Sequence, residues 1–110
     1  MDQTIPALLQ VFKSTPTLFP AKTIQELDLK LAGLENENIH IVTKEIKDWV
    51  SKQTRPIKDN VTLFAQSFRE IKSVRKVEAS EEEMLVNRFR ELRDAVKSKL
   101  NPPQRSQTNS

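Results

Sequence analysis

The sequence contains few of the side chains from which enzymes build catalytic sites. It has no cysteine and no tyrosine, and His40 is the one imidazole available as a general base for a serine. Gly33 is the one glycine, so the chain cannot form a glycine-rich loop that binds phosphate groups through backbone amides. We therefore expect a protein that is not an enzyme, with no catalytic residues and no cofactor.

Glu37 and His40 form the one pair whose spacing suggests a metal site. They lie at i and i+3, like the Glu-x-x-His elements of four-helix bundles that bind two iron ions. Such a site needs two of these elements and two further carboxylates. Because the chain has one histidine, only a symmetric dimer could supply the whole set. A helix-start glutamate beside an exposed histidine explains the pair better, and we expect no metal.

Arg90, Arg93 and Lys97 lie at i, i+3 and i+7, which places three cations on one flank of a helix. Like charges at this spacing destabilise a helix by roughly 0.2 to 0.5 kcal/mol unless an acidic group meets them. The flank is therefore a candidate contact for an acidic partner or for nucleic-acid phosphates. Because tyrosine is absent and Trp49 is expected in the core, stacking on single-stranded bases is poorly supported.

The charge distribution also bears on nucleic acid. Residues 1–43 hold three Lys against five Asp or Glu, a net charge of −2, whereas residues 44–110 hold fifteen Lys or Arg against ten acidic residues, a net charge of +5. This excess is modest, and a solvated surface of mixed charge is its commoner explanation. Nucleic acid is therefore the less favoured partner.

A helix from Ser80 to Leu100 is the best-marked element. Ser80 and Glu83 form a capping box, and three carboxylates in the first turn oppose the helix dipole favourably, as Lys97 and Lys99 do in the last. Asn101 and the two prolines after it stop the helix. One apolar stripe runs along it: Leu85, Phe89, Leu92, Val96 and Leu100.

Two short helices are expected near the start of the chain. Thr4 can cap the first, with Pro6 in its first turn. Its apolar face contains Ile5, Leu8, Leu9 and Phe12. Residues 14–22 then form a proline-containing connector, whose Leu18 and Phe19 are expected to pack into the core. We expect the two short helices to close one end of three longer ones.

The second helix is predicted from a capping box of Thr23 and Glu26. Leu27 and Leu31 supply its apolar face, and Gly33 is placed to end it in a left-handed conformation.

Residues 39–53 fit two structures. The β-branched residues 39–43 could form a short strand, but a single strand would have no partner. As a helix, the segment is capped by Asn36 or Asn38, ends before Arg55, and carries one apolar face, so we favour the helix. That face contains Ile39, Val42, Ile46, Trp49 and Val50.

A fourth helix is expected after a cap at Asp59 or Asn60. Its core stripe contains Val61, Phe64, Phe68 and Ile71. The short link at residues 77–79 predicts an antiparallel hairpin with the helix that starts at Ser80.

Leu63, Val74 and Val77 lie on the far side of this fourth helix from Val61. Such a surplus apolar face is either a second core layer or a partner interface, most simply that of a homodimer.

Together these features predict an all-α fold: a compact bundle of about five helices with a C-terminal antiparallel helical hairpin. Residues 1–101 would form one domain and residues 102–110 a disordered polar tail. No apolar run reaches the roughly 20 residues that span a bilayer, and the start lacks the basic region of a signal peptide, so we expect a cytoplasmic protein without a membrane partner.

The function that these features favour is a small interaction or adaptor module. It would contact a protein partner through helix faces, and a homodimer is one form that it could take. The alternative is a nucleic-acid-binding regulator that uses the flank of Arg90, Arg93 and Lys97, whose binding would weaken steeply as salt rises.

Overall fold

The first helix of the chain, α1 (Thr4–Ser14), lies at the centre of the structure. The computed structural model describes residues 2–74 and 81–100, with side chains described as far as Ser67 and again from Glu82. Eight of the eleven residues of α1 are buried. The expectation that this helix merely closes one end of the bundle is wrong. Its short sequence is mostly apolar, with Gln10, Lys13 and Ser14 exposed, and a helix that is apolar on most sides is stable only when other elements cover those sides.

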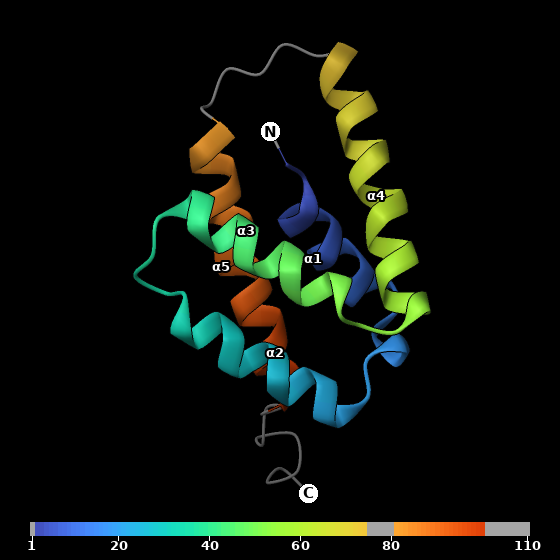
Figure 1. The fold of residues 1–110 in the computed structure, drawn as a ribbon, viewed down its shortest axis with the longest axis vertical. Helices are drawn as coiled ribbons and strands as arrows, with labels where there is room; N and C mark the ends of the chain where they lie inside the picture. The colour runs from blue at the N-terminus through green and yellow to red at the C-terminus, as the bar shows by residue number, and fades with distance from the viewer. Residues whose placement is uncertain (1, 75–80, 101–110) are drawn as a thin grey trace, which may run out of the picture.

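The described residues contain four further α-helices (Figure 1), of which the last three pack against α1 and the first packs mainly against the last. A short 3-10 turn, η1 (Pro16–Leu18), leads into the first of them, and the described residues contain no strand. The four are α2 (Ala21–Gly33), α3 (Ile39–Ser51), α4 (Arg55–Val74) and α5 (Glu81–Leu100). The all-α class is therefore confirmed, and residues 39–43 belong to a helix.

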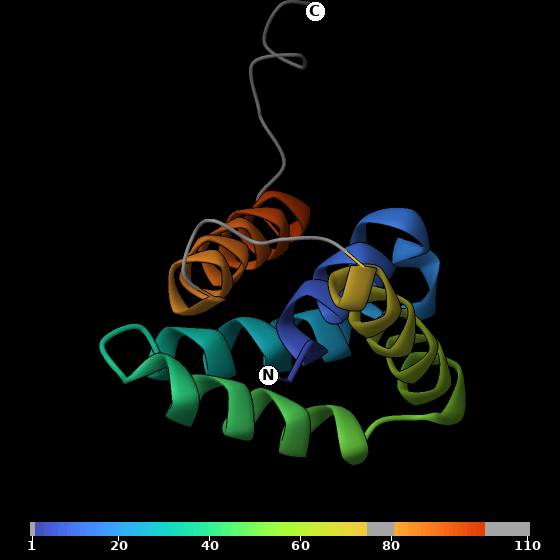
Figure 2. The same cartoon turned by 90° about the horizontal axis from the view of Figure 1, so that it is seen from above.

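Helices α4 and α5 run in opposite directions on either side of α1 (Figures 1 and 2). Both pack mainly against α1, so the first helix lies inside the expected hairpin. Residues 75–80, which join α4 to α5, lie outside the described residues, and the hairpin connection stays a prediction.

The apolar stripe of α5 faces the core as predicted. Leu92 and Val96 are fully buried, Leu85 and Phe89 nearly so, and Leu100 packs at the edge. The helix begins at Glu81. The predicted capping serine, Ser80, and the predicted tail lie outside the described residues.

The start of α1 differs from the prediction. Thr4 is the first helical residue rather than the cap, and its amide donates to Asp2 Oδ1 at 2.7 Å. The Thr4 hydroxyl donates to the same oxygen. The N-cap residue is Gln3, and Asp2, one residue earlier, satisfies the Thr4 amide, because a carboxylate is a strong acceptor for amides at a helix N-terminus.

The ends of α2 also differ. The helix begins at Ala21, directly after Pro20, and no side chain caps it, so Thr23 lies within the first turn. Gly33 does not have a positive φ. Instead the helix ends at Gly33, and the next residue, Leu34, packs into the core with 7% of its surface exposed. No left-handed residue is needed at this end.

Helix α4 begins at Arg55, four or five residues before the predicted cap. Pro56 is favourable in the first turn, because amides there have no acceptor within the helix and the missing one costs no hydrogen bond. Ile57, in the same turn, is 1% exposed, and its burial extends the helix toward α3.

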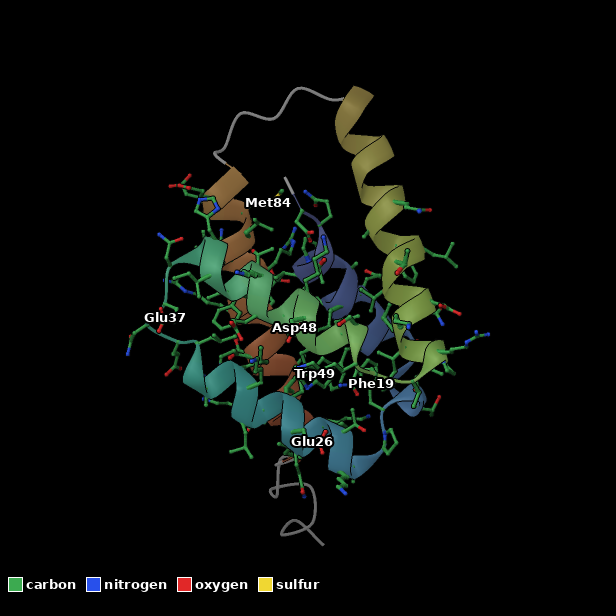
Figure 3. All side chains as sticks on the ribbon, viewed as in Figure 1. Phe19, Glu26, Glu37, Asp48, Trp49 and Met84 are labelled. Atoms are coloured by element: carbon green, nitrogen blue, oxygen red, sulfur yellow. The ribbon has the colours of Figure 1, made fainter. Side chains whose placement is uncertain are left out.

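The connector between α1 and α2 reaches the core as predicted. Phe19 is buried and meets the ring of Phe12 edge-on, with centroids 5.1 Å apart, while Leu18 packs beside them. Figure 3 labels Phe19 and, on α3, the buried Trp49.

Candidate interaction site

The candidate site begins with the cap of α3. Asn38 Oδ1 accepts a hydrogen bond from the His40 amide at 2.8 Å, which confirms one of the two predicted caps. This bond orients the first turn of α3, so that half-buried Ile39 packs at the edge of the core and His40 extends into solvent.

His40 then connects α3 to the start of α5. Its Nε2 lies 2.6 Å from Glu82 Oε2, and both side chains are more than half exposed. An exposed pair of this kind contributes little to the free energy of folding, but it joins two helix ends that are distant in sequence.

An open groove lies where α3 and α5 meet. It encloses about 690 Å³ and takes one side chain from α3 and six from the first half of α5. The lining residues are Ile39, Glu82, Glu83, Met84, Val86, Asn87 and Arg90. Met84, which Figure 3 labels, lies near the start of α5 and is half-buried, as are Ile39 and Val86. The groove therefore combines half-buried apolar side chains with exposed charged ones.

The charged side chains of the groove differ in sign along α5. Leu85 and Phe89 face the core, so Glu83, Asn87 and Arg90 face away from it and are exposed. Glu83 and Arg90 are seven residues apart, which places them on one side of α5 with about 10 Å between their positions along the axis. One end of the groove is acidic and the other basic.

The structure divides the predicted basic flank. Arg90 and Lys97 are exposed, but Arg93 is buried, with 10% of its side chain accessible. Its Nη1 lies 2.6 Å from Glu35 Oε2, in the turn after α2. The contact is an ion pair without hydrogen-bond geometry, since Nη1 has no hydrogen-bond acceptor among the described residues. An acidic group therefore does meet the flank, and it belongs to the same chain.

The predicted apolar face on α4 is described in part. Leu63 is 62% exposed, while Val61 and Ala65 on the same helix are buried. Leu63 therefore faces away from the core. The side chain of Val74 and the whole of Val77 lie outside the described residues.

Asp2 provides a second electrostatic feature, at the start of α1. Burial alone would raise the pKa of its carboxyl, but hydrogen bonds from the Thr4 hydroxyl and amide, together with Lys47, outweigh that effect and lower the pKa below its ordinary value of 3.8. Lys47 Nζ lies 3.1 Å from Asp2 Oδ2 and so links α3 to the start of the chain.

Glu37 and His40, whose spacing resembles that of a metal site, belong to no cluster of three possible metal ligands among the described residues. Glu37 lies at the outer edge of the turn between α2 and α3 (Figure 3), while His40 is engaged with Glu82. Within residues 2–74 and 81–100, no three His, Cys, Asp or Glu side chains come together in a way that would hold a metal ion. No helix in this part of the chain is both long enough and apolar enough to cross a membrane.

No protein family model matches the chain, and neither a curated protein nor a solved structure is significantly similar to it. The site must therefore be interpreted from its own residues. Sequence reasoning found Arg90 but missed Ile39 and Val86 as surface residues. Val86 lies about 100° from the core stripe, so its spacing marked it as a residue at the edge of the core.

Proposed function

We propose that this chain is a small cytoplasmic adaptor rather than an enzyme, and that it binds a protein partner through the groove between Ile39 and the first half of α5. The observation that carries the proposal is the groove itself. Its lining combines half-buried Ile39, Met84 and Val86 with exposed Glu83 and Arg90. Partner-binding surfaces commonly combine apolar contacts with polar and charged ones.

The way in which the groove is built supports the proposal. Four buried apolar side chains of α5 pack this helix, which supplies most of the groove lining, against α1. Asn38 caps the start of α3, which supplies the rest. A surface on helices that are already packed changes little on binding, which lowers the entropic cost of association. The open form suits a helix or an extended segment better than a small molecule, which is usually enclosed.

Leu63 supports a second protein-binding surface, on α4. Its exposed side chain is the described member of the apolar face predicted from Leu63, Val74 and Val77. A single exposed leucine is common on soluble proteins, so the groove is the stronger candidate.

Site-specific photo-crosslinking in cell extract would test the proposal. A photoreactive amino acid would replace Asn87 in the groove, Leu63 on α4, or Glu26 on the exposed side of α2 as a control. We expect adducts from position 87 and none from position 26. Adducts from position 63 alone would assign binding to α4, and no specific adduct from position 87 would contradict the proposed use of the groove.

Nucleic-acid binding remains the alternative, with Arg90 and Lys97 as its exposed cations. Pairing of Arg93 with Glu35 removes one of the three expected contacts. Fluorescence anisotropy of duplex and single-stranded oligonucleotides at about 50 and 200 mM salt separates the two functions. Micromolar binding that collapses at the higher salt would support the alternative, and absence of binding at both would exclude it.

A further inference from the structure

We infer that the partner that fits the groove is a second copy of this chain, with the two α5 helices antiparallel about a two-fold axis beside Val86 and Asn87. This inference rests on the proposed use of the groove for protein contacts. A second copy is favoured over a different protein because the charges of the groove complement themselves under that rotation.

The charge arrangement supplies the first step. Glu83 and Arg90 are exposed on the same side of α5. A two-fold axis midway between them, at the level of Val86 and Asn87, exchanges the two positions. Each Glu83 then meets Arg90 of the other copy, and the contact occurs twice. Two equivalent contacts of this kind define an isologous interface.

The residues next to the axis supply the second step. Val86 lies on the side of α5 that faces Ile39, and both are half-buried lining residues of the groove. Rotation about the axis brings Val86 and Ile39 of one copy toward the same residues of the other, which gives the interface an apolar centre. Asn87 lies on the other flank of the contact between the two α5 helices. Its amide can both donate to and accept from Asn87 of the second copy.

The position of α5 in the fold allows this approach. The side of α5 that faces away from α1 carries no other helix of the described chain (Figure 2). Antiparallel packing also places the acidic first turn of each α5 beside a more basic part of its partner and aligns the two helix dipoles in opposite directions. The interface is small, so we expect a weak dimer, with a dissociation constant of about 10 to 100 μM.

Charge reversal tests the pairing directly. Sedimentation velocity from about 5 to 500 μM, a range that brackets the expected constant, would be measured for the wild type, Glu83→Arg, Arg90→Glu, their equimolar mixture and the double variant. Each single variant places like charges together twice and should weaken self-association at least tenfold. The mixture restores both opposite-charge contacts, so it should form a heterodimer, and the double variant should dimerise like the wild type. Glu26→Arg on α2 is the matched control and should dimerise normally.

Several results would overturn the inference. A wild type that stays monomeric at every concentration would do so, as would single variants that fail to associate when mixed. Loss of the dimer with Leu63→Asp and not with Arg90→Glu would place the interface on α4. A monomer that still gives adducts with another protein from position 87 would end this inference and leave the proposed function standing.

Discussion

Arg93 Nη1 lies 2.6 Å from Glu35 Oε2, and this contact joins the turn after α2 to the buried side of α5. The Arg93 side chain is nine-tenths buried, whereas the Glu35 side chain is more than half exposed. The pair therefore depends on Glu35 to neutralise a charge that has little access to water.

Removing the Glu35 carboxylate should lower the free energy of unfolding more than removing the positive charge of Arg93. Glu35→Ala leaves a buried cation without a partner and should lower the free energy of unfolding by about 1 to 2 kcal/mol. Arg93→Met keeps most of the side-chain volume without the charge and should cost less. Urea unfolding of both variants checks the order, and a Glu35→Ala protein as stable as the wild type would show that the pair is immaterial.

The central position of α1 predicts a steep difference between two leucines. Leu8 is fully buried and Leu29, on α2, is 73% exposed. Leu8→Ala should destabilise the chain by about 2 to 5 kcal/mol because it opens a cavity in the core. Leu29→Ala should change stability by about 0.5 kcal/mol or less. Thermal and urea unfolding would measure both, and equal effects would contradict the central placement of α1.

Asp2 predicts a specific dependence of stability on pH. Its pKa is lower in the folded chain than its ordinary value of 3.8, so its contribution to stability is present above that value and is lost as the pH falls through the lower folded-state pKa. Asp2→Asn should therefore be less stable than the wild type at pH 7, and the difference should shrink below about pH 4. Asp94→Asn, on the exposed side of α5, is the control. A difference that persists unchanged in acid would contradict this role of Asp2.

The two asparagines before α3 should behave differently. Asn38 accepts from the His40 amide, so Asn38→Ala should destabilise the chain by about 1 kcal/mol and speed hydrogen exchange in the first turn of α3. Asn36 is exposed and Asn36→Ala should do neither. Similar exchange rates in the two variants would argue against the cap.

The sequence predicted the helices best where one face alone is apolar. The stripe of α5 and the helix that starts at Ile39 were both predicted from spacing, since a period of 3.6 residues can be read without tertiary information. The place of α1 was missed because Pro6 and its short length suggested a peripheral element, although its mostly apolar sequence required burial on most of its sides.

Caps and pairs were harder to predict. Thr23 with Glu26 resembles a capping box locally, but the helix begins earlier, at Ala21, because tertiary packing outweighs a cap of about 1 kcal/mol. Arg93 had the spacing of a surface cation, and its partner Glu35 is 58 residues away in the sequence. The groove likewise needs α3 and α5 together, so no single segment reveals it.

The most direct test of the proposed function compares two single substitutions in the crosslinking experiment. Val86→Asp places a charge in the lining of the groove, and Leu63→Asp places one on the exposed side of α4; circular dichroism would confirm that both variants stay folded. With the photoreactive residue at position 87, we expect Val86→Asp to abolish the adducts and Leu63→Asp to leave them unchanged. Adducts that survive Val86→Asp, or that disappear only with Leu63→Asp, would contradict the assignment of partner binding to the groove.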